Sequence, residues 1–236
     1  MGRAFEFRRA RKEKRWDKMS KAFTKLGREI AMSVKQGGPD PAGNPRLRMA
    51  IQNAKGVNMP KEKVESAIKR ASAKDAGDFQ EMTYEGYGPG GVALLVDCAT
   101  DNPTRTVANM RMYFSRGGGT LGASGSLDFL FEKKGVFQLD PEGLDMETLE
   151  LELIDFGAED IKLEDGEIYI YTQFSDFGTM ARALEERKIV PISAAVQRVA
   201  TNATEVPEEL EESIVALIEK LEDDDDVQAV YHNMGN

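Results

Sequence analysis

The order of strand-like and helical patterns between residues 135 and 198 most constrains the fold of this chain. The patterns follow one another as β-α-β-β-α-β, at residues 135–139, 146–156, 160–163, 167–172, 177–186 and 193–198. Glu164-Asp165-Gly166 separates the two central strands and has the composition of a hairpin turn. This order is the split βαβ, or ferredoxin-like, arrangement. The sequence therefore predicts a ferredoxin-like α+β domain over residues 134–200.

The segments on both sides of this unit predict a second α+β domain that it interrupts. Its elements lie at residues 82–87, 91–99, 101–114 and 126–131 before the interruption, and at 207–221 and 227–231 after it. The late helix and strand complete the earlier β-β-α-β set. We therefore predict one discontinuous domain built from residues 80–133 and 201–236, with 134–200 inserted into it.

Residues 1–79 have the patterns of a helical domain. Apolar residues recur at spacings of three and four along the segment 8–35, which predicts one helix with an apolar stripe. The stripe consists of Trp16, Met19, Phe23, Leu26 and Ile30. Asn44-Pro45 is predicted to cap and begin a second helix, and Pro60 to begin a third. The predicted fold class is thus α+β with three domains: an N-terminal three-helix domain and two ferredoxin-like-type α+β domains, one inserted in the other.

Three aromatic residues near the N-terminus have more than one interpretation. Trp16 is interpreted as a core residue because it belongs to the apolar stripe, the alternative being a ring that stacks on a nucleic-acid base. Phe5 and Phe7 precede the stripe and are interleaved with arginines. Base stacking, membrane contact and docking onto the helical domain all stay open for these two side chains.

Charge is divided unevenly along the chain. The first 75 residues carry twenty Lys and Arg against eight Asp and Glu, whereas the remaining residues carry eleven against thirty-three. The net charge of −10 therefore conceals a basic segment joined to an acidic body. Because ordinary protein surfaces mix both signs, we interpret the basic segment as a polyanion-binding module in preference to a solvated helix face.

The candidate contacts to nucleic acid are basic side chains of this segment. They are Arg3, Arg8, Arg9, Arg11, Lys12, Lys14, Arg15, Lys18, Lys21, Lys25, Arg28, Arg46, Arg48, Lys69 and Arg70. Contacts to phosphates fit DNA and RNA alike and carry no sequence information. The chain shows no helix-turn-helix recognition pattern and no RRM-type aromatic signature, which favours recognition of the shape of folded RNA.

Three motifs that suggest ligand sites have structural interpretations that we prefer. Gly86–Gly91 matches G-x-G-x-x-G, but a strand follows it where a dinucleotide site requires a helix, so a hairpin turn is predicted. Thr100–Arg105 lies at a predicted helix N-terminus, where capping by Asp101 or Asn102 is favoured over phosphate binding. Glu222–Asp226 is interpreted as a solvated helix end in preference to a cation site.

The sequence offers no catalytic or metal-binding constellation. Cys98 is the only cysteine and lies in an apolar run, which predicts a buried thiol and excludes an intramolecular disulfide. His232 is the only histidine, and nothing near it in the sequence orients it for catalysis. We predict no cofactor and no metal. No apolar stretch is long enough to span a membrane, so a cytoplasmic protein without a membrane partner is expected.

Several segments, taken together and in this order, resemble the YebC/PmpR family, also called the translational activator of cytochrome c oxidase family. They are Phe23–Ile30, Asn44–Arg48, Asn58–Lys61, Ala67–Arg70, Tyr84–Val92, Thr100–Asn102 with Arg105-Thr106, and Phe131–Gly135. They extend over nearly the whole chain. The resemblance implies a three-domain α+β protein with a helical N-terminal domain and an inserted third domain.

The resemblance also implies a regulator of gene expression without enzymatic activity. Members are commonly described as DNA-binding transcriptional regulators, and others as translation factors that act at the ribosome, including on proline-rich nascent sequences. We therefore predict a non-enzymatic nucleic-acid-binding regulator, by the family description a DNA-binding transcriptional regulator. The alternative is an RNA- or ribosome-binding translation factor that assists synthesis of proline-rich stretches. The predicted partners are accordingly DNA or ribosomal RNA, with the ribosome on the second interpretation.

Overall fold

The N-terminal domain consists of three helices around a small shared core. The computed structural model describes residues 3–73 and 77–235, with the side chains of the first helix described from Met19 onward. The helices are α1 (Arg3–Gly37), α2 (Pro45–Gly56) and α3 (Lys61–Ala71). Ile30, Leu47 and Ala67, one from each helix, lie in the same buried cluster. Within the predicted apolar stripe, Phe23, Leu26 and Ile30 therefore form the face on which the helices pack.

A buried asparagine joins the first two helices. The Asn44 side chain accepts a hydrogen bond from the Leu47 amide at 3.0 Å, which caps α2 as predicted. Its amide group donates to the carbonyls of Ser33 and Gly38, at 2.7 and 2.9 Å. Asn44 therefore satisfies backbone groups at the end of α1 and at the start of α2.

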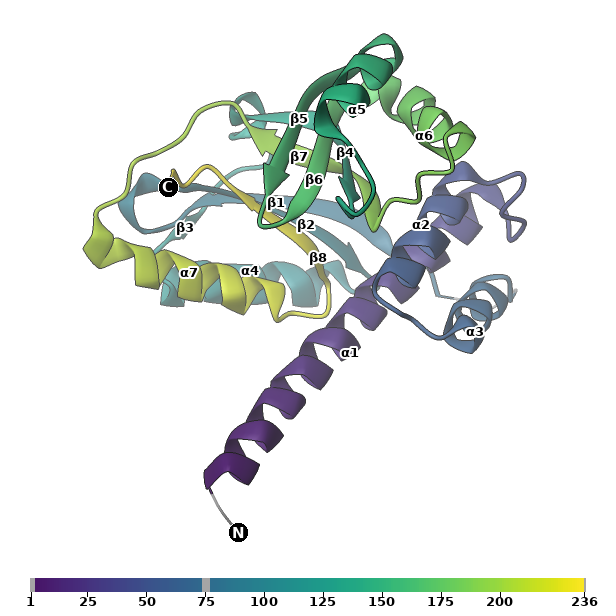
Figure 1. Cartoon of the computed structure of the whole chain (residues 1–236). Coiled ribbons are helices and arrows are strands. Elements are labelled where there is room, and N and C mark those ends of the chain that lie inside the picture. Colours follow the sequence, from purple (N-terminus) through teal and green to yellow (C-terminus); the bar gives the residue numbers. More distant parts are fainter. Residues whose placement is uncertain (1–2, 74–76, 236) are drawn as a thin grey trace.

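The first sheet is antiparallel and is covered on one face by two helices. It contains β1 (Gln80–Tyr87), β2 (Ala93–Thr100), β3 (Thr120–Leu121) and β8 (Val227–His232), in the order β3-β1-β2-β8. The covering helices, seen together in Figure 1, are α4 (Pro103–Arg116) and α7 (Glu208–Glu222). Leu94 and Val96 of β2 pack against them, whereas Ala93 and Leu95 pack on the opposite face with Leu127. Both faces of β2 are thus buried, which explains its nearly continuous apolar sequence.

The second sheet has the ferredoxin-like order that the sequence predicts. It contains β4 (Phe131–Leu139), β5 (Ala158–Glu164), β6 (Glu167–Gln173) and β7 (Ser193–Ala200), in the order β5-β6-β4-β7. All neighbouring strands are antiparallel, and α5 (Met146–Leu153) and α6 (Phe177–Glu186) supply the helices. Phe137, Ile168 and Ile170 of the sheet pack with Leu153 and Leu184 of these helices.

The predicted strand at 126–131 is wrong. The chain forms a short 3-10 turn at Asp128–Leu130 and enters β4 at Phe131, and the fourth strand of the first sheet is the short β3 instead. The reason is the buried carboxylate of Glu85, which accepts from the Gly125 amide at 2.7 Å and from the Leu127 amide at 2.6 Å. These bonds satisfy the backbone amides in a loop conformation without strand pairing.

The remaining predicted elements have shifted ends but the predicted type. The first helix extends over Arg3–Gly37, and the helix predicted from residue 101 begins at Pro103. The motif Gly86–Gly91 connects two paired strands, with Gly90 at φ 69° and Gly91 at φ 78°, so the hairpin-turn prediction is confirmed. The domain ranges 1–79, 80–133 with 201–236, and 134–200 stay predictions.

Candidate nucleic-acid interface

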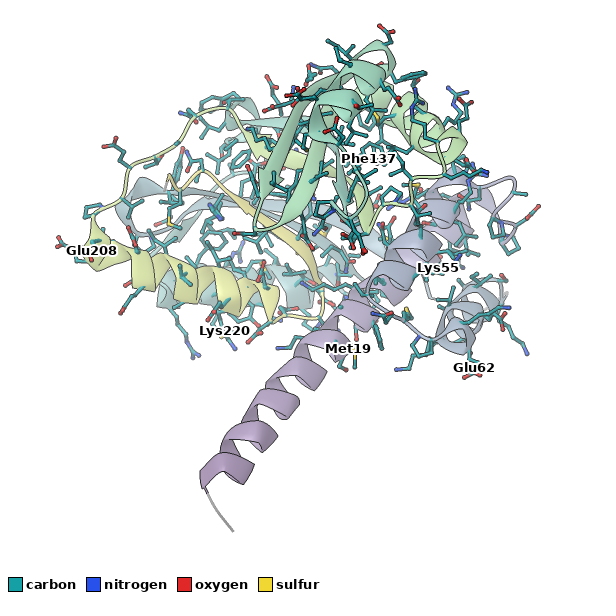
Figure 2. All side chains as sticks on the ribbon, in the orientation of Figure 1. Met19, Lys55, Glu62, Phe137, Glu208 and Lys220 are labelled. Atoms are coloured by element: carbon teal, nitrogen blue, oxygen red, sulfur yellow. The ribbon has the colours of Figure 1, made fainter. Side chains whose placement is uncertain are left out.

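The first half of α1 carries the densest group of candidate residues. Figure 1 shows this half as a single helix that projects away from the rest of the molecule. At a rise of about 1.5 Å per residue, residues 3–18 extend roughly 24 Å. Eight candidates lie on it: Arg3, Arg8, Arg9, Arg11, Lys12, Lys14, Arg15 and Lys18. Their side chains, and those of Phe5, Phe7 and Trp16, lie outside the described residues, and described side chains begin at Met19 (Figure 2).

The second half of α1 presents its basic residues to an acidic segment of the first sheet domain. Lys21 Nζ lies 2.6 Å from Asp223 Oδ1, and Arg28 Nη1 lies 2.7 Å from Asp226 Oδ1. Burial lowers the pKa of Lys25, an effect that the nearby Glu222 carboxylate opposes. We call residues 222–226 the acidic segment. Lys21, Lys25 and Arg28 are spaced four and three apart and therefore share one face of α1. The acidic segment lies along that face.

The interpretation of Glu222–Asp226 as a solvated helix end is wrong for Asp226. This residue is 2% exposed and accepts hydrogen bonds from Arg105 Nη2 at 2.7 Å and from Thr106 Oγ1 at 2.9 Å, in addition to Arg28. Burial raises the pKa of Asp226, but the hydrogen bonds from Arg105, Arg28 and Thr106 outweigh burial and lower it below its ordinary value. Asp226 therefore holds α1 and α4 together as a carboxylate.

The motif Thr100–Arg105 contributes to the same contact between α1 and α4. The Asn102 side chain accepts from the Arg105 amide at 3.1 Å and caps α4, so the capping interpretation is confirmed. The Arg105 guanidinium is engaged by Asp226 and by Asp101. The helix N-terminus and its arginine are therefore used within the molecule.

The candidates on α2 and α3 differ in what surrounds them. Arg46 donates to Glu29, Gln36 and Glu81, and the hydrogen bond to Glu29 contributes most to raising its pKa. Arg48, Lys69 and Arg70 are exposed, and within the described part of the chain none of them forms an ion pair. Arg28 and Arg46 are thus occupied inside the molecule, whereas these three exposed side chains are open to a ligand.

Sequence reasoning missed the acidic segment as a partner of α1. The only signal was the spacing of Lys21, Lys25 and Arg28 opposite a carboxylate run almost 200 residues later, and spacing alone does not pair two distant segments. The prediction for Cys98 is confirmed, because the thiol is buried and burial raises its pKa. Among the described residues, no group of His, Cys, Asp and Glu is arranged to hold a metal ion. None of the described helices has the length and apolar character to cross a membrane.

Comparisons with known proteins agree over the whole chain. Residues 3–74 match the family model described as "TACO1/YebC protein N-terminal domain", and residues 79–234 match "TACO1/YebC second and third domain". A "Probable transcriptional regulatory protein" of Cytophaga hutchinsonii is 59% identical over 234 residues, covering 99% of this chain and 98% of the relative. One of the same name from Parabacteroides distasonis is 55% identical, covering 99% and 97%.

A solved structure has the same fold. It is described as "Crystal Structure of a Conserved Hypothetical Protein Aq1575 from Aquifex Aeolicus" and is 38% identical to this chain. The two superpose with a TM-score of 0.84, over 92% of this chain and 90% of the other.

Proposed function

This chain belongs to the TACO1/YebC family, and from that premise we propose that it is a non-enzymatic, nucleic-acid-binding regulator of gene expression. The relatives named above are each described as "Probable transcriptional regulatory protein", which supports the regulatory class. The observation that carries nucleic-acid binding is the projecting half of α1. Along residues 3–18 it bears eight Lys and Arg against three acidic residues, in a helix held at only one end by the rest of the fold.

Intramolecular pairing occupies basic residues in the second half of α1 and on α2, which favours the projecting half of α1 as the interface. The acidic segment neutralises Lys21 and Arg28, and Glu29 and Glu81 neutralise Arg46. Lys and Arg on a projecting helix attract phosphates that lie within about one Debye length of it, and contacts to phosphate position a protein without reading bases. The acidic domains limit non-specific binding to other polyanions.

The nucleic acid is DNA on the first candidate function and RNA or the ribosome on the second. The sequence has no helix-turn-helix recognition pattern and no RRM-type aromatic signature. This absence favours recognition of backbone shape, and so supports the second candidate, a translation factor that acts on folded RNA. The first candidate has the support of the relatives' printed names.

The test compares two variants with the same change in charge. Arg8→Glu with Arg9→Glu alters the projecting half of α1, whereas Arg111→Glu with Arg116→Glu alters exposed positions on α4. We expect the α1 variant to bind duplex DNA and folded ribosomal RNA about tenfold or more weakly, and the α4 variant to bind as the parent does. Equal binding by the α1 variant and the parent at physiological salt contradicts the proposed interface.

Two further measurements separate the candidate functions. On the translation candidate, the parent sediments with ribosomes in a sucrose gradient, and the α1 variant leaves those fractions. On the transcription candidate, the parent protects a defined promoter sequence in a footprint and does not sediment with ribosomes. We expect sedimentation with ribosomes.

A further inference from the structure

A large groove lies where the three parts of the molecule meet. Its volume is about 1840 Å³, and its walls come from α1 and α2, from the first sheet, and from β4, β7 and α6. Hydrogen bonds hold the walls in place. The Asn53 side chain pairs with both backbone groups of Ala194, each at 2.9 Å, and Arg46 donates to Glu81. Arg198 Nε lies 3.6 Å from Asp97.

Basic residues gather at this groove on a domain that is otherwise acidic. Residues 134–200 contain six Lys and Arg against fifteen Asp and Glu. Three of the six basic residues line the groove, namely Arg182, Lys188 and Arg198, but only two of the fifteen acidic residues do, Asp140 and Glu185. The acidic domain thus contributes half of its basic side chains to the groove.

The helical domain faces them with basic side chains of its own. Arg48 and Lys55, the latter labelled on α2 in Figure 2, line the groove from the helical domain, and Lys133 of β4 also lines it. Within the described part of the chain, these three residues, Arg182 and Lys188 form no ion pair. The lining acids Glu29, Glu81 and Asp97 are already paired with Arg46 or Arg198. Positive charge is therefore in excess among the unpaired lining groups.

Exposed apolar side chains also line the groove. Phe174, Val190 and Val196 all line it, with 58%, 75% and 38% of their surfaces exposed. Exposed apolar groups of this size, on a wall rimmed by polar residues, are typical of an interaction site. A groove that offers both an exposed aromatic ring and unpaired cations has the combination that binds unpaired nucleotides, because bases stack on the ring while phosphates meet the cations.

We infer that the groove binds a single-stranded segment of nucleic acid, with a base stacked on Phe174 and phosphates on Arg48, Lys55, Arg182 and Lys188. A paired strand keeps its bases stacked inside the duplex, so only an unpaired strand offers them to these apolar side chains. This inference rests on the proposed function, and it adds a second contact surface that is distinct from the projecting half of α1. The protein thus binds nucleic acid where a duplex and an unpaired strand meet.

The test uses fluorescence anisotropy with two probes, a short unstructured oligouridylate and an RNA duplex of equal length. Phe174→Ala is expected to weaken binding of the oligouridylate about fivefold or more, with duplex binding unchanged. Arg182→Glu with Lys188→Glu is expected to give the same selective loss. Phe129→Ala is the matched control, because Phe129 is 74% exposed and lies outside the groove.

The outcomes distinguish this inference from the proposed function. Arg8→Glu with Arg9→Glu is expected to weaken binding of both probes, so a loss confined to that variant overturns the groove and retains the α1 interface. A loss confined to the groove variants overturns the α1 interface and retains the groove. Absence of binding to either probe by the parent overturns both. If the parent binds labelled polyglutamate, Arg182→Glu with Lys188→Glu does not, and excess oligouridylate fails to displace the polyglutamate, the groove is reassigned to an acidic peptide and the inference is contradicted.

Discussion

At the residue scale, the junction between the helical domain and the first sheet depends on one carboxylate. The Asp226 side chain is 3% exposed. It accepts hydrogen bonds from Arg28 of α1 and from Arg105 and Thr106 of α4. Removing one partner of a buried ion pair leaves the other charge without compensation, which costs far more than the pair itself contributes. Among the ion pairs described, those of Asp226 are therefore the ones whose loss we expect to measure.

Asp226→Asn is expected to lower the free energy of unfolding by about 3 kcal/mol at neutral pH. The folded pKa of Asp226 lies below its ordinary value, because hydrogen bonds from both arginines outweigh burial. The contribution of the carboxylate is therefore fully present above the unfolded pKa of about 3.9, and it is lost as pH falls through the folded pKa. Urea unfolding of parent and variant from neutral to acidic pH measures both effects.

The control for this substitution is Asp225→Asn, at the exposed neighbouring residue. It is expected to change the free energy of unfolding by less than about 0.5 kcal/mol. The difference in free energy of unfolding between the parent and Asp226→Asn is expected to shrink as the pH drops below about 4. A difference that stays constant over this range contradicts the assignment.

At the element scale, α1 is one helix with two environments. From Phe23 to Ile30 its apolar stripe packs against α2 and α3, and its basic face meets the acidic segment. Its first half projects beyond these contacts (Figure 1). Such a helix is stabilised mainly by the packing of its second half, because isolated helices are marginal in water.

Trp16→Ala tests how far the packed stripe extends. If Trp16 continues the stripe, as its spacing predicts, the substitution lowers the free energy of unfolding by about 3 kcal/mol or more. Thermal unfolding and duplex binding are measured on the same preparation. A variant that unfolds like the parent but binds nucleic acid more weakly shows instead that Trp16 stacks on a base.

At the scale of the whole molecule, α2 also joins the helical domain to the second sheet. Asn53 bonds both backbone groups of Ala194 on β7, which is an edge strand of its sheet. The side chain amide therefore takes the place of a neighbouring strand. The close approach at Gly56 agrees with this, because a Cβ there would lie 2.0 Å from the Ile192 carbonyl oxygen.

Asn53→Ala is expected to lower the free energy of unfolding by about 1–3 kcal/mol, since it leaves both backbone groups of the buried residue Ala194 without their Asn53 partner. Lys55→Ala, at an exposed position on the same helix, is the control and is expected to unfold like the parent. Denaturant unfolding followed by tyrosine fluorescence compares the three proteins. Equal midpoints for Asn53→Ala and Lys55→Ala contradict a role for Asn53 in joining the domains.

The affinity of the whole molecule for a duplex is expected to be mainly electrostatic. If about five phosphates are neutralised, the logarithm of the binding constant falls with the logarithm of salt concentration with a slope of about −4 to −5. Arg8→Glu with Arg9→Glu is expected to make this slope less steep by about 2, because two phosphate contacts are lost. Affinity that is constant between low and physiological salt contradicts an electrostatic interface.

The sequence alone was sufficient for every feature that depends on neighbouring residues. Asn44 and Asn102 cap the helices that follow them, and the β-α-β-β-α-β order of residues 135–198 forms the predicted ferredoxin-like sheet. The charge division of the chain was equally visible. Caps, turns and periodicity are local, since a helix or strand repeats its side chain environment every few residues.

Only the tertiary structure decided what distant residues do to one another. Glu85 holds the segment around Leu127 in a loop that its composition predicted as a strand. Asp226 belongs to a run of carboxylates but is buried, and it forms an ion pair with Arg28. This pairing engages Arg28 of α1 inside the molecule. A carboxylate has the same local sequence signal whether it is solvated or paired, because pairing depends on which donors the fold brings within about 3 Å of it.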